Sequence, residues 1–499
     1  MDKQKADLLV VTALDEVAWL LNLRADDIPY NPVFRSYIML SDAKMTLFLD
    51  SGRITPGVDF HLHVRQCIDG VCFSVTAYDN LVPRLKTAAA NPAVRKVLLP
   101  KKYSYAGGVS YAVYNAVPSS KRLSAVSPVL ELKARKNEVE FQGMKNSHLR
   151  DAVALVDFLA FLEKEIEAGN DWDEISAATK LEEYRAEQDH FVGLSFGTIS
   201  AYGSNGAVIH YKPSNLTKKK ITRDSLYLLD SGGQYKDGTT DVTRTLHYGS
   251  PTEFQKEAYT RVLMGSIDLA KLVFPKGTGD ISVDVLARQH LYQVGLDYNH
   301  GTGHGIGMFL NVHEAPVQLR IYSKENHKLQ LGYFFSDEPG YYKPFEFGIR
   351  LETILAVVKA QTKYESGKDF YEFEPITLVP FEPKLINLDM LDAQQCAYLN
   401  AYHDLVRTKV GAALEEQGRM AGLAYLRKKT ASVECNNLSG AGRSSSCSSA
   451  QAATSNDLQS RFSGDYIIAN GALTSCRADS NLVVLLVVLF AILSASRFQ

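Results

Sequence analysis

Residues that commonly bind metal ions recur down the second half of the chain, each within a segment typical of a β-strand or a tight turn. The five residues are Asp230, Asp241, His304, Glu338 and Glu352, in the segments LLDSGGQY, TTDVTRT, HGTGHGIG, SDEPGYY and GIRLE. Four carboxylates and one imidazole suit a pair of hard or borderline divalent cations, which together can activate water at neutral pH. Because these residues lie far apart in the sequence, the fold must bring several distant β-segments to one place.

The length of 499 residues is too great for one hydrophobic core, so two domains with additional segments are expected. We expect the first domain over residues 1–130. There a buried strand, ADLLVVT, precedes a helical segment, ALDEVAWLLNL, and residues 34–49 alternate as strands do. We expect the second domain over residues 137–430, beginning with a long helix near Asn137 and ending with a helical segment over residues 391–429. The predicted fold class is α/β (α+β).

The composition changes after the second domain. Residues 431–481 are rich in Ser, Ala and Asn, which is typical of a disordered stalk or linker. Residues 482–499 form a hydrophobic C-terminal end, whose unbroken apolar run is shorter than the roughly 20 residues of a spanning helix. Small residues at 470–472 and a polar spacer precede this run, which is the layout of a GPI-attachment signal, with Asn470 as a candidate attachment site. The alternative is an accidental apolar patch at a disordered end.

The start of the chain bears on location. MDKQKADLLVVTAL opens with charged residues and a buried strand, and no small-residue cleavage site follows, so we expect no signal peptide here. GPI attachment requires the secretory pathway, so this hypothesis predicts a precursor that begins upstream. The predicted location is the extracellular face of the plasma membrane by a GPI anchor, with the cytoplasm as the alternative. A net charge of −2 predicts no nucleic-acid partner.

The sequence around each candidate ligand predicts a β-edge or a turn. Asp230 ends an apolar strand, and the turn residues SGGQYKDG separate it from Asp241, so a hairpin would bring the two carboxylates together. His304 follows a glycine-rich stretch, Glu338 precedes a Pro-Gly turn, and Glu352 lies in a strand. Any one of these residues alone is more typical of a cap or a loop. The residue types, their order and their local context together indicate a site.

The motifs D-S-G-x-Q-Y, T-T-D-V-T-R-T, H-G-T-G-H-G-I-G, N-V-H-E, D-E-P-G-Y-Y and G-I-R-L-E resemble those of the eukaryotic aminopeptidase P family, the Xaa-Pro aminopeptidases. The resemblance extends to about Thr430 and includes VVTALDEVAWLLNLR near the start. It implies a creatinase-like N-terminal domain followed by a pita-bread metallopeptidase catalytic domain. The stretch EFQKEAYTRVLMGSIDLAKLVFPKGT is closer to the membrane-bound type than to the cytosolic one. Long members of the family carry a further α/β domain before the one that begins this chain.

The resemblance implies a role for each candidate ligand. Asp230 would bind one metal ion, while Asp241 and Glu352 would bridge both. His304 and Glu338 would bind the second ion. A hydroxide activated by the two cations would attack the carbonyl before proline, and Glu338 would handle the proton of the attacking water.

The resemblance also implies roles for five residues around the metal ions. His313 would transfer protons, and His210 and His300 would hold the substrate. Tyr235 and Arg350 would orient the carboxylates. Buried structural histidines, a structural hydrogen bond and an ordinary ion pair are the alternative interpretations of these residues.

The function implied is a metallo-aminopeptidase that removes the N-terminal residue from Xaa-Pro peptides with two divalent ions, Mn²⁺ or Zn²⁺. Its partners would be proline-containing peptides, and a homodimer remains open. One alternative is a prolidase that cleaves only Xaa-Pro dipeptides. Another is a catalytically impaired pita-bread protein that only binds its partner, although such a protein would be expected to lose metal ligands.

Two cysteines near the start suggest a disulfide. Cys67 and Cys72 flank Ile-Asp-Gly-Val, and a two-residue turn at Asp69-Gly70 would place them opposite each other at a separation that suits a disulfide. Two reduced thiols on a strand pair are the alternative. The other cysteines show no metal-binding spacing: Cys396, Cys435, Cys447 and Cys476.

Overall fold

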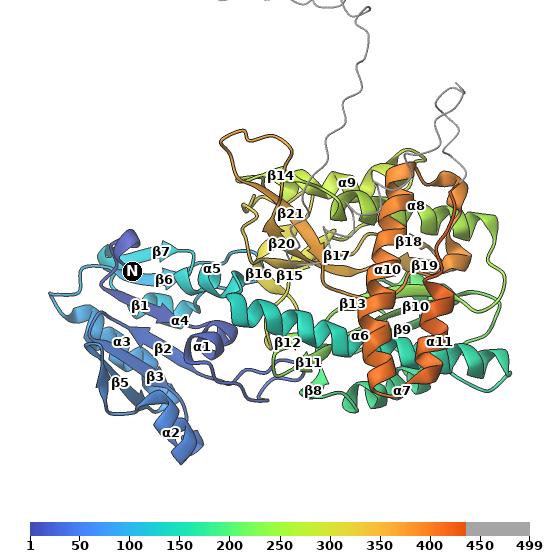
Figure 1. Ribbon diagram of the computed structural model, residues 1–499. Coiled ribbons are helices and arrows are strands. Elements are labelled where there is room, and N and C mark those ends of the chain that lie inside the picture. Colours follow the sequence, from blue (N-terminus) through green and yellow to red (C-terminus); the bar gives the residue numbers. More distant parts are fainter. Residues whose placement is uncertain (436–499) are drawn as a thin grey trace, which may run out of the picture.

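The computed structural model describes residues 1–435 of the chain (Figure 1). The predicted GPI-type tail lies outside the described residues, as does all but the first part of the predicted stalk. Within residues 1–435, no helix is both long enough and apolar enough to cross a membrane.

A seven-stranded sheet in the order β4-β5-β3-β2-β1-β6-β7 organises the N-terminal region. Its strands are β1 (Leu8–Val11), β2 (Tyr37–Leu40), β3 (Lys44–Phe48), β4 (Cys67–Ile68), β5 (Val71–Thr76), β6 (Val97–Pro100) and β7 (Arg122–Ala125). Its helices are α1 (Leu14–Leu21), α2 (Pro56–Leu62), α3 (Leu81–Ala90), α4 (Tyr111–Asn115) and α5 (Pro128–Ala134). The predicted buried strand is β1, whose residues alternate between two cores. Leu9 and Val11 pack with α1, while Leu8 and Val10 pack with α3. This alternation is expected for a sheet with helices on both faces, and it confirms the predicted mixed α/β architecture.

The long helix α6 (Glu138–Glu167) leads from the N-terminal region into the rest of the molecule and begins where the sequence predicted (Figure 1). Asn137 and Glu140 form a capping box: the Asn137 side chain accepts from the backbone N–H of Glu140, and the Glu140 carboxylate accepts from that of Asn137. The capping box satisfies two N–H groups that have no partner within the helix. Met144 and Leu159 belong to the buried apolar stripe predicted for this helix.

Four further sheets make up the rest of the described chain, in the orders β13-β10-β9, β12-β11-β8, β14-β21-β20-β17-β15-β16 and β18-β19. The strands are β8 (Phe191–Leu194), β9 (Ile199–Tyr202), β10 (Leu226–Ser231), β11 (Gly233–Tyr235), β12 (Gly238–Thr239), β13 (Val242–His247), β14 (Phe274–Pro275), β15 (Gly303–Gly305), β16 (Glu314–Leu319), β17 (Phe334–Asp337), β18 (Gly340–Lys343), β19 (Phe347–Arg350), β20 (Thr353–Lys359) and β21 (Phe370–Pro375). The helices are α7 (Glu174–Ala186), α8 (Glu253–Ala270), α9 (Ile281–Tyr292), α10 (Ala393–Glu416) and α11 (Met420–Lys429).

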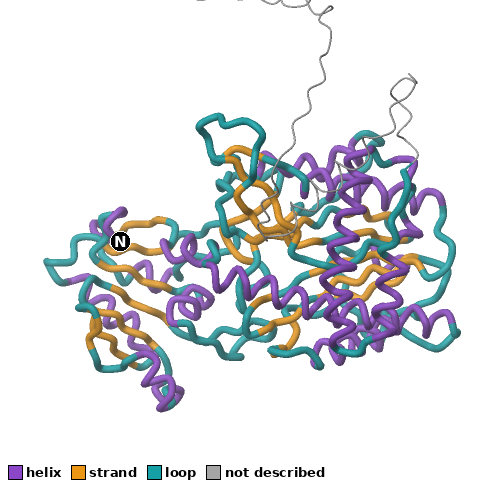
Figure 2. The backbone as a smooth tube through the Cα atoms, in the orientation of Figure 1, coloured by secondary structure: helices purple, strands orange, loops and turns teal. Residues whose placement is uncertain are grey.

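The helices of this larger part cover its strands from outside. Helices α6, α10 and α11 pack side by side, and the strands lie behind them in the view of Figure 2. One core cluster joins these helices to α8, α9 and the central strands, with Leu159 of α6, Leu229 of β10, Leu355 of β20 and Leu399 of α10 among its members. The strands that carry the candidate ligands therefore stand on one continuous core.

The helical segment predicted over residues 391–429 is two helices, α10 and α11. Between them Gly418 has a φ of 67°, a left-handed conformation that glycine adopts without strain and that ends a helix.

Two disulfides are present among the described residues. Cys67 and Cys72 are direct partners in the β4–β5 hairpin and are joined, and both turn residues, Asp69 and Gly70, have positive φ, as the predicted two-residue turn requires. The disulfide interpretation is therefore confirmed. The second disulfide joins Cys396 of α10 to Cys435, a pair 39 residues apart that sequence spacing did not suggest.

Polar contacts fix the N-terminal region against the larger part. The Arg24 guanidinium donates to the backbone carbonyls of Phe309 at 2.6 Å and Met308 at 3.2 Å. Gln234 donates to the Tyr30 carbonyl at 3.1 Å. The two Arg24 bonds hold the turn between β15 and β16, which is close to His304 and His313 in sequence.

Candidate metal centre

The first two candidate ligands lie on neighbouring strands. Asp230 is in β10 directly opposite Thr243 of the antiparallel strand β13, and Asp241 immediately precedes β13. The chain between them folds back as the short hairpin β11–β12. The predicted hairpin is confirmed, and it brings the two carboxylates to the same end of the strand pair.

The other three candidate ligands come from the six-stranded sheet and its edge. His304 lies in β15, Glu338 directly follows β17, and Glu352 falls between β19 and β20. Strand β17 pairs with both β15 and β20, so the three segments are adjacent. Folding therefore gathers residues that are up to 122 positions apart in sequence (352 − 230).

The five side chains converge at one place. The Nε2 atom of His304 lies 3.5 Å from Asp241 Oδ2, 3.6 Å from Glu338 Oε1 and 4.0 Å from Glu352 Oε1. One ligand atom from each of Asp241, His304 and Glu352 falls within 4.8 Å of the others, a spacing at which they could hold one metal ion. Asp230 joins this group by lining the same cavity.

The buried carboxylates of this cluster repel one another, and a positive charge would stabilise them. Burial raises the pKa of Asp241 well above its usual value, and the Asp230 carboxylate adds to the effect. Burial, and then the neighbouring charge of Glu352, raises the pKa of Glu338 in the same way. The Oδ1 atom of Asp230 is buried without a hydrogen-bond partner in the described part of the chain. A crowded set of oxygen donors with one unpaired oxygen and one neutral imidazole fits divalent cations.

Arg350 contacts the cluster, as predicted. Its guanidinium donates to Asp230 Oδ2 at 2.6 Å and to the Tyr342 hydroxyl at 2.8 Å, and that hydroxyl lies 2.8 Å from His300 Nε2. Thr243 donates its hydroxyl proton to Glu352 at 2.8 Å. The Asp230 and Glu352 carboxylates are thus held by side chains of β19 and β13.

Tyr235 has different contacts. Its hydroxyl donates to Asp151 at 2.9 Å, and Asp151 is also paired with the buried Arg185. The prediction that Tyr235 orients the metal-binding carboxylates is therefore wrong as to direct contact. The alternative, a structural hydrogen bond, describes what Tyr235 does.

The His304 ring of the cluster contacts two further rings, those of His313 and Tyr105, in turn. The His304 and His313 ring centroids are 4.2 Å apart in an edge-on arrangement, and the Tyr105 ring lies 5.3 Å from that of His313. Burial lowers the pKa of His304 to about 4, and proximity to His304 lowers the pKa of His313 to about 3. Both imidazoles are therefore neutral at pH 7, the form in which a histidine binds a metal ion or accepts a proton.

The cluster lies in a cavity of about 680 Å³. His210 and His313 line this cavity and are exposed to it, whereas His300 is half-buried. Burial, and then the charge of Arg350, lowers the pKa of His300 to about 3. The three predicted histidines thus surround the cluster, with His210 and His313 accessible to a bound molecule.

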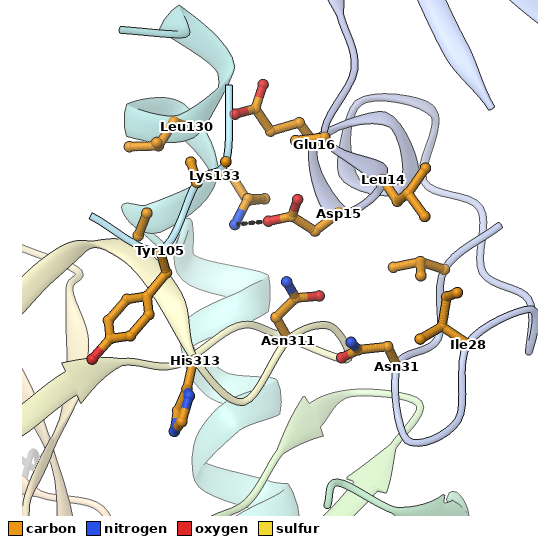
Figure 3. A pocket seen from close by; sticks show the side chains of 15 residues that line it. Leu14, Asp15, Glu16, Ile28, Asn31, Tyr105, Leu130, Lys133, Asn311 and His313 are labelled. Atoms are coloured by element: carbon orange, nitrogen blue, oxygen red, sulfur yellow. Dashed lines mark ion pairs between the residues drawn. The ribbon is translucent and has the colours of Figure 1, made fainter. Parts of the chain in front are cut away.

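A second cavity of about 370 Å³ lies behind Tyr105 and His313, which line both cavities (Figure 3). On its far side, Asp15 of the N-terminal region pairs with Lys133 at 3.1 Å. The N-terminal region therefore contributes to the surroundings of the cluster through Tyr105.

Comparisons with known proteins agree with this geometry. The family model "Metallopeptidase family M24" matches residues 142–359, "Creatinase/Prolidase N-terminal domain" matches residues 1–140, and "C-terminal region of peptidase_M24" matches residues 369–433. Xaa-Pro aminopeptidase ApepP of Drosophila melanogaster is 43% identical over 431 residues, covering 86% of this chain and 68% of that protein. The chain belongs to the Xaa-Pro aminopeptidase family.

Other members of the Xaa-Pro aminopeptidase family are similar over an equal share of the chain. Xaa-Pro aminopeptidase 1 of Dictyostelium discoideum and Xaa-Pro aminopeptidase 2 of Sus scrofa are each 44% identical and each cover 86% of the chain. The chain spans 66% and 62% of their respective lengths.

Among solved structures, X-prolyl aminopeptidase from Caenorhabditis elegans, described as a cytosolic enzyme with a di-nuclear active site, superimposes with a TM-score of 0.81 at 35% identity. It covers 87% of this chain, which spans 69% of that one. A prolidase from Pyrococcus furiosus, 20% identical with a TM-score of 0.56 over 76% of this chain and 98% of its own, shares the fold. The predicted creatinase-like and pita-bread architecture of Xaa-Pro aminopeptidases is confirmed.

Sequence reasoning missed three residues of this candidate site. Tyr342 and Thr243 lie inside motifs that had been recognised, DEPGYY and TTDVTRT, so the signal was present but was assigned only to the ligands. Tyr105 lies in no such motif. Its contact with His313 joins segments about 200 residues apart in sequence, and only the folded structure brings them together.

Proposed function

We propose that this chain catalyses hydrolysis of the first peptide bond of peptides whose second residue is proline. The observation that carries the proposal is the convergence of four carboxylates and His304 in one cavity, surrounded by three histidines, in a member of the Xaa-Pro aminopeptidase family. Prolines at the second position make the scissile bond a tertiary amide with a rigid ring on its leaving side. A cavity with fixed side chains suits such a rigid group.

The candidate ligands would together bind two divalent cations, Mn²⁺ or Zn²⁺. Asp230 would hold one, His304 and Glu338 would hold the other, and Asp241 and Glu352 would serve both. Such cations would supply the positive charge that acidifies a water molecule and polarises the scissile carbonyl. Glu338 would accept the proton of the attacking water, since it is the candidate ligand whose side chain is least buried.

The surrounding residues hold the substrate and the ligands. Arg350 fixes Asp230 by a short charged hydrogen bond. Tyr342 links Arg350 to His300, which keeps the His300 ring in one orientation facing the substrate. His313 is exposed to the cavity, and it would pass the proton that Glu338 takes from the attacking water to the departing proline nitrogen.

The test is tripeptide hydrolysis by metal-free protein reconstituted separately with Mn²⁺ and Zn²⁺. The proposal predicts cleavage of Ala-Pro-Ala to alanine and Pro-Ala, with the Ala-Pro dipeptide a poorer substrate. Cleavage of the dipeptide alone would make the chain a prolidase. Failure to bind either metal would instead favour a protein that binds peptides without cleaving them.

We further propose the domain limits 1–130 and 137–430, separated at the start of α6, and attachment of the chain to a membrane by a lipid on its C-terminal side. The supporting feature for attachment is the order of small, polar and apolar residues over 470–493. Release of the expressed protein from cells by a phosphatidylinositol-specific phospholipase tests this attachment. Sedimentation of the purified protein tests the homodimer that the family resemblance leaves open.

A further inference from the structure

A groove leads away from the metal-centre cavity toward the surface. It encloses about 390 Å³ and shares two lining residues, Gln318 and Arg320, with that cavity. Gln318 lies directly opposite His304 in the β15–β16 ladder. The groove therefore begins beside a candidate metal ligand, and Arg320 follows two residues further along.

The groove has one wall from each half of the molecule. Lys102 and Ser104 of the N-terminal region form one wall, and the segment that follows β16 forms the other. The backbone N–H of Ser104 donates to the Glu325 carboxylate at 2.8 Å, and the Tyr103 hydroxyl lies 3.2 Å from His327 Nδ1. These bonds join the two walls, so the groove is formed by the packing of the two regions against each other.

The charge of the groove is opposite to that of the metal centre. Three cations line it, Lys102, Arg320 and Lys324, against one carboxylate, Glu325, a balance of +2 (3 − 1). All three cations are exposed, and none forms an ion pair with another residue in 1–435. Glu325 is occupied by the Ser104 N–H. The guanidinium and the two ammonium groups are thus available to an anion from outside.

The direction of the groove matches what an aminopeptidase must accommodate. Only one residue lies before the scissile bond, so the rest of the peptide has to leave the cavity on the other side. The free end of that remainder carries a carboxylate. An extended peptide advances about 3.4 Å per residue, so the Arg320 side chain is within reach of the end of a tripeptide or tetrapeptide.

We propose that this groove binds a carboxylate on the part of the substrate that follows the scissile bond, with Arg320 as the first contact and Lys102 and Lys324 beyond it. The proposal rests on the proposed function and names its preferred substrates: short peptides with a free C-terminus, or longer ones with Asp or Glu two or three residues after the cleaved bond. The exposed ring of Tyr322 adds an apolar surface beside the cations.

The experiment compares three forms of one peptide. Ala-Pro-Ala-Ala is used as the free acid, as the C-terminal amide, and as the amide with Glu in the last position. The expected kcat/KM is roughly three- to tenfold higher for the free acid than for the plain amide. The ratio falls toward one in Arg320→Gln and at high salt, because screening weakens exposed charge pairs. The Glu amide distinguishes a side-chain carboxylate from the C-terminal one, and preference for either carboxylate supports the proposal.

The matched control is Lys101→Gln, an exposed lysine adjacent to Lys102 that does not line the groove. This variant keeps the wild-type ratio. Equal kcat/KM for acid and amide in the wild type, or a ratio unchanged by Arg320→Gln, would overturn the proposal.

A binding measurement separates this proposal from the proposed function. Calorimetry with the product peptide Pro-Ala-Ala and its amide reports the carboxylate preference without turnover. If no peptide is cleaved but the acid binds several-fold more tightly in an Arg320-dependent way, the groove assignment holds and the hydrolytic function fails. If all forms are cleaved but acid and amide bind equally, the hydrolytic function holds and the groove assignment fails.

Discussion

The two clusters of buried charge on either side of the His313–Glu314 peptide bond differ in how their charges are balanced. In one, Glu314 is paired with both Lys133 and Lys136, and Lys133 also pairs with Asp15. Two cations face two carboxylates. In the other, four carboxylates converge around His304 and are contacted by one guanidinium, that of Arg350.

This difference separates a structural role from a functional one. A buried ion pair that is complete in itself needs no further partner, and here it joins α5 of the N-terminal region to β16. A buried set of carboxylates with excess negative charge is costly until a cation arrives. Because Glu314 directly follows His313, the ion pairs of Glu314 also fix the segment that places His313 beside the carboxylate cluster.

The largest expected effect follows from removing Asp241, which we propose both ions share. Asp241→Ala should lower kcat/KM by more than about a hundredfold and lower the bound metal, because one carboxylate serves both ions. Metal analysis and tripeptide hydrolysis measure this. The control is Asp171→Ala, which removes an exposed partner of Lys220 and should leave both readouts unchanged. Full activity in Asp241→Ala would contradict the ligand assignment.

The next largest effect is expected from breaking the ion pairs that Glu314 forms with Lys133 and Lys136. Glu314→Gln leaves Lys133 and Lys136 buried without their carboxylate and should lower the free energy of unfolding by about 3–5 kcal/mol. Urea unfolding of the metal-free protein measures it. The matched control is Glu346→Gln, which breaks an exposed pair with Lys343 and should change stability by less than about 0.5 kcal/mol. Equal effects of the two substitutions would remove the distinction between buried and exposed pairs.

A smaller effect is expected at His313, which lies between the two clusters. His313→Ala should slow turnover by about a hundredfold, the contribution of a proton-transferring residue, while metal content stays at the wild-type level. Loss of metal in step with activity would make His313 a ligand instead.

The smallest effect concerns pH in the metal-free protein. The carboxylates Asp241, Glu338 and Glu352 have raised pKa values in the folded state, so the stability they contribute is present at low pH and is lost as pH rises through those values. The histidines, whose pKa values are lowered, oppose this trend only below about pH 6.5. Above about pH 6.5, where the histidines no longer oppose it, the free energy of unfolding should therefore fall as these carboxylates lose their protons, by at most about 1.4 kcal/mol per pH unit for each proton retained. A free energy of unfolding that rises with pH over this range would contradict an excess of negative charge in the cluster.

Sequence alone predicted the parts of this molecule that depend on local patterns. The strand–helix start, the beginning of the long helix near Asn137, the hairpin between Asp230 and Asp241, and the disulfide across Asp69-Gly70 all depend on patterns of neighbouring residues. The five candidate ligands and Arg350 were chosen through motifs, and the fold brings them together.

Contacts between distant segments escaped prediction. Lys133 and Glu314 are far apart in sequence, as are Tyr105 and His313, and no periodicity links either pair. Tyr235 lies in a recognised motif, yet its hydroxyl points to Asp151 on α6. Side-chain partners across a domain junction depend on how the elements pack, which a linear pattern does not encode.

The most direct measurement compares Asp241→Asn with Glu314→Gln in metal-free and metal-loaded protein by urea unfolding. We predict that, without metal, Asp241→Asn is as stable as the wild type or more stable, because it relieves repulsion, whereas Glu314→Gln is destabilised. Adding Mn²⁺ should stabilise the wild type and Glu314→Gln, but have little effect on Asp241→Asn. Metal-free Asp241→Asn that loses as much stability as Glu314→Gln would contradict the account, because it would show that the carboxylate cluster is already balanced.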